Sequence, residues 1–136
     1  MALRLTIIAQ RMVFCVSEED ILKCYSYDTN ESTWSELDLG PAAGQQLHPE
    51  SGLCACFNPE GIRVYFQDPS GSLRGIAMQN GTWTELGTVP AKPARGTPLS
   101  VAFSNSTFYL YYMNADGYLH YLNMSIPNGQ WKGIRP

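Results

Sequence analysis

The chain has 136 residues, a formal net charge of −3, hydrophobic residues at 44% of its positions and charged residues at 15%. This length suits a single domain with its own core, and the high apolar fraction excludes an intrinsically disordered chain. The small negative charge argues against nucleic acid as a partner. No apolar run is long enough for membrane insertion as a spanning helix.

Short runs rich in β-branched and aromatic residues fill the chain, and turn residues separate them. In chain order these runs are 3–8, 12–16, 21–25, 30–37, 53–57, 62–66, 73–77, 80–86, 99–103, 108–112, 118–122 and 128–134. Such runs predict β-strands, and no segment has the 3.6-residue apolar period of a long amphipathic helix. The sequence therefore predicts an all-β protein.

Three tryptophans, Trp34, Trp83 and Trp131, recur at near-equal intervals, and three apolar runs precede each of them. The pairs Asn80-Gly81 and Asn128-Gly129 are typical of tight hairpin turns. Segments rich in Pro, Gly and Ala separate the copies. This pattern predicts three repeats, approximately 1–40, 50–88 and 97–136, within one domain 1–136, each a four-stranded antiparallel blade.

Three blades would leave two radial faces uncovered, whereas propellers have four or more blades. Large exposed apolar faces are rare on soluble monomers. We therefore expect half of a six-bladed β-propeller that homodimerisation closes about a twofold axis. Two alternatives are half of a longer chain and a compact prism of three sheets.

The four cysteines, Cys15, Cys24, Cys54 and Cys56, all lie in predicted strands and lack the spacing of a zinc site. We expect buried free thiols in a reducing compartment, with no metal and no cofactor. The apolar stretch at residues 3–8 is too short for a signal peptide. The expected location is thus cytoplasmic, with any release by a non-classical route.

The middle repeat carries Ile62-Arg-Val-Tyr-Phe-Gln-Asp-Pro-Ser-Gly71 and, after a short strand, Asn80-Gly-Thr-Trp83. This repeat resembles one blade of the fungal and bacterial fucose-specific six-bladed propeller lectins of the Aleuria type. The resemblance implies sugar sites between neighbouring blades. In it, Arg and Glu of one blade hold the sugar hydroxyls, and aromatic residues of the next blade stack on the sugar. Short members of this family assemble from several chains, which is consistent with a homodimer.

The family pattern is only partly present in the three repeats. In chain order the arginine position holds Met12, Arg63 and Tyr109, and the glutamate position holds Cys24, Gly75 and Tyr121. The terminal tryptophan is kept in every repeat. Loss of the carboxylate removes a strong acceptor for sugar hydroxyls, so either the specificity has shifted or sugar binding has been lost.

Period-2 alternation places Arg63, Tyr65 and Gln67 on one face of the predicted strand. A charge between blades needs a partner or a ligand. Arg63 is therefore either a hydrogen-bond donor to a ligand or part of a structural ion pair with Asp68 or Glu60. The expected ligand-binding residues are Arg63, Trp34, Trp83, Trp131, Tyr65, Gln67 and Tyr109.

Catalytic motifs are missing from the sequence: it has no phosphate loop, no framed carboxylate pair and no nucleophile with a base. We therefore do not expect an enzyme. The favoured function is a carbohydrate-binding, lectin-like module with inter-blade sites for fucose or a related saccharide or glycoconjugate. The alternative is a non-catalytic propeller scaffold for protein interactions that has lost sugar binding.

Overall fold

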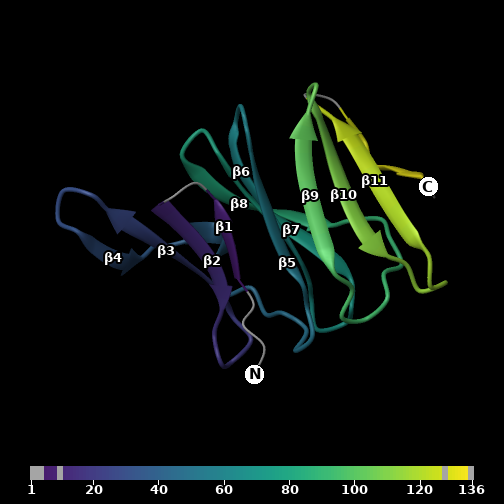
Figure 1. Ribbon diagram of the computed structural model, residues 1–136, viewed down its shortest axis with the longest axis horizontal. Helices are drawn as coiled ribbons and strands as arrows, with labels where there is room; N and C mark the ends of the chain where they lie inside the picture. The colour runs from purple at the N-terminus through teal and green to yellow at the C-terminus, as the bar shows by residue number, and fades with distance from the viewer. Residues whose placement is uncertain (1–4, 9–10, 127–128, 135–136) are drawn as a thin grey trace.

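The computed structural model describes residues 5–8, 11–126 and 129–134, and Figure 1 shows three antiparallel sheets side by side. The first sheet has the order β1 (Leu5–Ile8), β2 (Met12–Val16), β3 (Leu22–Asp28) and β4 (Thr33–Glu36). The second has β5 (Leu53–Asn58), β6 (Gly61–Gln67), β7 (Leu73–Gln79) and β8 (Thr82–Thr88). The third has β9 (Leu99–Ser104), β10 (Thr107–Met113), β11 (Leu119–Ser125) and β12 (Lys132–Ile134).

The prediction of an all-β chain built from three antiparallel meanders is confirmed. The first expected strand began at residue 3, but residues 3 and 4, like Asn128 of the third expected hairpin, lie outside the described residues. A short 3-10 helix, η2 (Gly40–Ala42), lies in the connection between the first and second sheets. Within the described ranges no helix has the length and apolarity to cross a bilayer.

The second sheet lies between the other two (Figure 1), and its first strand, β5, contacts the first strands of the other two sheets, β1 and β9. The burial of the strands follows from this arrangement of the three sheets. Every residue of β6 from Ile62 to Gln67 is buried, because neighbouring sheets cover both faces of the middle sheet. In β10, Phe108, Leu110 and Tyr112 are buried and alternate with more exposed residues, because one face points away from the second sheet.

Two apolar cores hold the sheets together, and we call them the first and second seams. The first seam packs Phe14 and Leu22 of the first sheet against Ile62, Val64 and other residues of the second. The second seam packs Tyr65 and Leu73 of the second sheet against residues of the third, including Leu110 and Leu122. This side-by-side packing is that of propeller blades, and the sheets do not form a prism.

Turn chemistry fixes the register of the middle blade. Asn80 and Gly81 have φ angles of 52° and 84°, as the predicted Asn-Gly hairpin requires. Gly61 begins β6 with a φ of 150°, and a Cβ there would lie 2.0 Å from the Met78 carbonyl oxygen. Any larger residue at position 61 would therefore push β6 and β7 apart.

Asp68 organises the turn between β6 and β7. Its Oδ1 accepts hydrogen bonds from the backbone N–H groups of Ser70 and Ser72, both at 3.0 Å, and its Oδ2 pairs with Arg74 Nε at 2.7 Å. Burial acts to raise the pKa of Asp68, but the hydrogen bonds from Ser70, Arg74 and Ser72 outweigh it and hold the pKa below its usual value. The ionised carboxylate therefore stabilises the fold.

Replacing Asp68 by Asn should lower the free energy of unfolding by about 1 kcal/mol at neutral pH, because the charge-assisted bonds weaken. The folded pKa of Asp68 is lowered, so this stabilisation is present above the unfolded pKa of about 3.9 and is lost as the pH falls below it. Urea titrations from pH 7 to pH 2 should show the difference between wild type and Asp68→Asn shrinking. A constant difference across this range, or the same shrinkage in the exposed control Glu18→Gln, would contradict the assignment.

Candidate functional site

Each seam contains a pair of aromatic rings at equivalent positions of the repeats. In the first seam, Trp83 of the second sheet packs edge-on against Phe14, with 5.8 Å between ring centroids and an angle of 70°. In the second seam, Trp131, which immediately precedes β12 of the third sheet, meets Tyr65 in the same way, at 5.9 Å and 78°. The terminal tryptophan of one blade thus packs on the preceding blade, which makes the two seams directly comparable.

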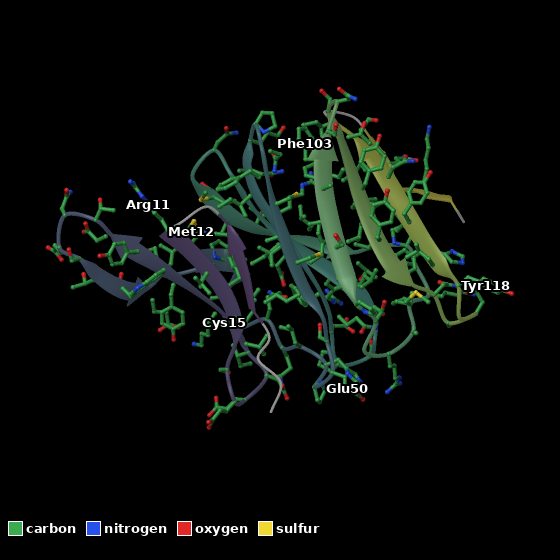
Figure 2. The ribbon with its side chains drawn as sticks, in the orientation of Figure 1. Arg11, Met12, Cys15, Glu50, Phe103 and Tyr118 are labelled. Atoms are coloured by element: carbon green, nitrogen blue, oxygen red, sulfur yellow. The ribbon has the colours of Figure 1, made fainter. Side chains whose placement is uncertain are left out.

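The first seam is apolar at the positions where a sugar site would lie. Met12 and Cys24, at the arginine and glutamate positions, pack in the same core as Phe14 and Trp83, and Figure 2 shows Met12 at the start of β2. Trp83 is only 6% exposed. Burial raises the pKa of the Cys24 thiol to about 12, so it remains neutral. These residues form a sealed contact rather than a polar pocket.

The second seam opens into a pocket of about 480 Å³, a size that suits a small ligand. Its lining comes from both blades and the connection between them. The residues are Arg63, Tyr65, Leu86, Thr88, Val89, Pro90, Met124, Gly129, Gln130 and Trp131. Arg63 and the half-buried Trp131 face this space from adjacent blades, so a cation and an aromatic ring converge on one site.

Arg63 is 6% exposed and lies across the seam. Its guanidinium carbon is 4.0 Å from the centroid of the Phe108 ring on the third sheet, a cation–π contact. Its Nη1 donates to Tyr65 Oη at 3.2 Å. Arg63 also lines the pocket of the second seam, and among the described residues no fully buried side-chain nitrogen or oxygen lacks a hydrogen-bond partner.

Tyr65 occupies the space that a side chain at position 75 would need. The two residues are directly opposite in the β6–β7 ladder, and a Cβ on Gly75 would lie 2.7 Å from Tyr65 Cε1. Burial raises the pKa of Tyr65 to about 12, although the Arg63 charge opposes this shift. The phenol of Tyr65 is therefore neutral, and Gly75 contributes no carboxylate to the pocket.

The alternative that Arg63 forms a structural ion pair is wrong. Asp68 pairs with Arg74, and Glu60 accepts a hydrogen bond from Gln79 Nε2 at 3.2 Å. The ion pairs between described residues are Lys23–Glu36, Arg74–Asp68 and His120–Asp116, and none of these includes Arg63. Arg63 is thus a buried cation whose described partners are neutral.

The remaining predicted site residues lie elsewhere. Gln67 is fully buried, and its amide bonds to Gly71 O, Ala94 O and Gly96 N, which ties the β6–β7 turn to the second connection. Trp83 lies in the first seam. Trp34 is 53% exposed on the outer face of the first sheet, beside Tyr27. Tyr109 contacts Tyr121 on the outer face of the third sheet, with ring centroids 6.5 Å apart.

Several residues of the pocket were not predicted. Phe108 supports Arg63 from the next blade, and Thr88, Met124 and Gln130 are among the lining residues. Thr88 ends β8 and Gln130 precedes β12, where a single sequence carries no periodic signal, whereas Phe108 and Met124 lie within β10 and β11 and meet the second sheet only across the seam. Only the position of the connection after β8, between two blades, hinted at such a role. In the described ranges no group of three or more side chains forms a candidate metal site.

The chain matches solved lectin structures over its whole length. It is 21% identical to the lectin of Aleuria aurantia, described as a six-bladed β-propeller with a fucose recognition mode, with a TM-score of 0.78 over 98% of this chain and 47% of that one. It is 22% identical to AofleA of Arthrobotrys oligospora, with a TM-score of 0.76 over 97% of this chain and 42% of that one. A fucose lectin of Kordia zhangzhouensis, solved with methyl-fucoside, matches at 11% identity and a TM-score of 0.63, covering 99% of this chain and 100% of that one.

Family profiles and curated protein sequences give no match to this chain. The chain spans less than half the length of the Aleuria and Arthrobotrys lectins. At these identities the likeness shows the fold, and the fold agrees with the resemblance seen in the middle repeat. The protein therefore has the blade architecture of the fucose-specific propeller lectins of the Aleuria type.

The close approach of Tyr65 to Gly75 predicts that a side chain added at position 75 destabilises the folded protein. Gly75→Ala should lower the free energy of unfolding by about 1–3 kcal/mol, because the new Cβ overlaps the buried ring. The cost should fall in a Tyr65→Ala background, measured as the coupling energy of a double-mutant cycle. The matched control is Gly133→Ala, whose Cβ would meet only the Leu122 side chain, at 3.1 Å. Additive effects of the two substitutions would show that the ring does not occupy this space.

Proposed function

We propose that this protein is a carbohydrate-binding, lectin-like module, and that the pocket of the second seam is its saccharide site. One observation carries the proposal: Arg63 of one blade and Trp131 of the next line the same pocket. A saccharide has polar hydroxyls around its ring and apolar C–H faces. This pocket offers a complementary donor group and an aromatic ring from opposite sides.

Each side of the pocket would have a separate task. The half-buried indole of Trp131 provides a platform for the apolar face of a sugar ring. The guanidinium of Arg63 is held in place by Phe108 and Tyr65 and directs its remaining donors to the ligand. Thr88 and Gln130, both exposed, add neutral polar groups at the rim. Such a preorganised site loses little side-chain entropy on binding.

The likeness to known lectins supports this proposal and also limits it. The related Aleuria and Kordia structures are described as fucose-recognising lectins. Here Gly75 stands at the position where the family pattern implies a carboxylate, so a charge-assisted acceptor for hydroxyls is missing. We therefore propose a specificity that differs from that of a standard fucose site.

A glycan array with purified protein, followed by calorimetry on the glycans that bind, tests the proposal. Arg63→Ala should weaken binding by roughly 10–100-fold, because a charge-assisted hydrogen bond contributes about 1.5–3 kcal/mol. Trp131→Ala should weaken it by at least about 5-fold through loss of the stacking surface. Both variants should keep the β-sheet circular dichroism of the wild type.

Arg95→Ala is the matched control, because Arg95 is exposed on the second connection and does not line the pocket. It should bind as the wild type does. A blank array with folded wild-type protein at high concentration would overturn the carbohydrate-binding function. Binding that Arg63→Ala and Trp131→Ala both leave intact would place the site elsewhere.

We also propose that two copies close a six-bladed ring, as the seam geometry suggests. Tyr111 of the third sheet is the positional counterpart of Phe14 and Tyr65, and it is 37% exposed. Trp34 is the counterpart of Trp83 and Trp131. If Trp34 of a second copy packed on Tyr111, both exposed rings would be buried in the same edge-on contact that joins the internal blades.

Light scattering coupled to gel filtration tests ring closure. The wild type should have about twice the 15.1 kDa mass of the chain, whereas Trp34→Ser and Tyr111→Ser should shift it to the monomer mass. Phe57→Ser, which removes an exposed aromatic ring from the middle blade, should leave the mass unchanged. A wild type that stays monomeric at every concentration tested would contradict closure by a second copy.

A second candidate function is a scaffold that binds another protein. The observation that favours it is the row of aromatic rings on the outer face of the third sheet, where Tyr111 and Tyr121 lie 5.3 Å apart between centroids. Aromatic side chains are enriched at protein interfaces. A blank glycan array together with a monomeric wild type would favour this function over the lectin.

A further inference from the structure

We propose that the pocket of the second seam prefers an acidic saccharide, one that carries a carboxylate or a phosphate ester, over its neutral counterpart. This inference rests on the proposed function, because it names the class of sugar for the same pocket. It depends on the charge balance of the site, which can be followed residue by residue.

Among the described residues that line the pocket, Arg63 is the one with a formal charge. The other lining residues are neutral: Tyr65, Leu86, Thr88, Val89, Pro90, Met124, Gly129, Gln130 and Trp131. The two carboxylates expected as partners of Arg63 are bonded to other residues. Asp68, on the turn that follows β6, pairs with Arg74, and Glu60 accepts a hydrogen bond from Gln79. The pocket therefore presents an uncompensated positive charge to whatever enters it.

A buried guanidinium without an anion is unfavourable, because burial removes most of its hydration. The Phe108 ring and the Tyr65 hydroxyl recover part of this loss but supply no negative charge. The neutral phenol of Tyr65 cannot change this within the working pH range, since burial raises its pKa to about 12. An anionic group on the ligand would supply the missing charge.

The geometry favours an anion on a sugar over a free ion. Arg63 is fixed by contacts on two sides, and a planar guanidinium fork matches a carboxylate or phosphate through paired hydrogen bonds. Trp131 faces the same space with an apolar ring, which a bare anion would not use. A ligand that satisfies both residues has an acidic substituent beside an apolar ring face.

Position 75 carries no side chain that could compensate this charge. Gly75 lies opposite Tyr65 in the β6–β7 ladder, and a Cβ there would lie 2.7 Å from the Tyr65 ring as that ring is placed here. No carboxylate therefore reaches Arg63 from this position, and the pocket favours a ligand that accepts hydrogen bonds from Arg63.

Calorimetry with matched sugars tests the preference without any variant. Methyl β-D-glucuronide should bind at least about 10-fold tighter than methyl β-D-glucoside, a difference of about 1.4 kcal/mol. The pair methyl α-D-galacturonide and methyl α-D-galactoside should show the same order. Raising the salt concentration should weaken the acidic sugars selectively. The affinity for glucose 6-phosphate, measured in the same way, shows whether a phosphate ester is preferred to a carboxylate.

The variants assign the preference to Arg63. Arg63→Ala should abolish the difference within each pair, whereas Arg63→Lys should keep part of it because the charge remains without the fork. Arg95→Ala, the exposed control, should keep all of it. Equal or tighter binding of the neutral sugars to the wild type would overturn this inference while leaving the lectin function intact. No binding of any glycan, acidic or neutral, would overturn both.

Discussion

The contact between adjacent blades is the constraint on which the rest of this structure depends. No sheet here can bury its own apolar face, so each seam must be formed by side chains from two repeats. The edge-on rings Phe14–Trp83 and Tyr65–Trp131 repeat this solution with nearly equal spacing. Because the candidate pocket lies in one of these seams, residues that pack the blades together also line the pocket.

The two seams show how one scaffold can be either closed or open. Met12 and Cys24 fill the first seam with apolar atoms, and burial keeps the Cys24 thiol neutral. In the second seam Arg63 and Gly75 occupy the same positions, and a pocket remains beside them. The difference lies in side chains, since both seams use equivalent strands of neighbouring sheets and an equivalent edge-on ring contact.

The fold could be predicted well from the sequence. The strand patterns are local signals, and the near-equal spacing of Trp34, Trp83 and Trp131 is a periodic one. The sequence predicted the candidate site less well. Which tryptophan reaches a pocket depends on its neighbours: Trp83 is sealed by Phe14, Trp34 is exposed, and only Trp131 lines the cavity. The position of Phe108 under Arg63 is a contact across blades, which no local pattern in a single sequence encodes.

The pairing of Tyr65 with Gly75 explains why the site cannot be inferred by copying a family motif. The two residues are far enough apart in sequence to look independent, yet they are opposite each other in the β6–β7 ladder and share one volume. A glycine without a Cβ permits a large ring, and the ring in turn provides the hydroxyl that orients Arg63. With no side chain at position 75, Arg63 has no carboxylate beside it there, and the Tyr65 ring lies in the space that such a side chain would enter.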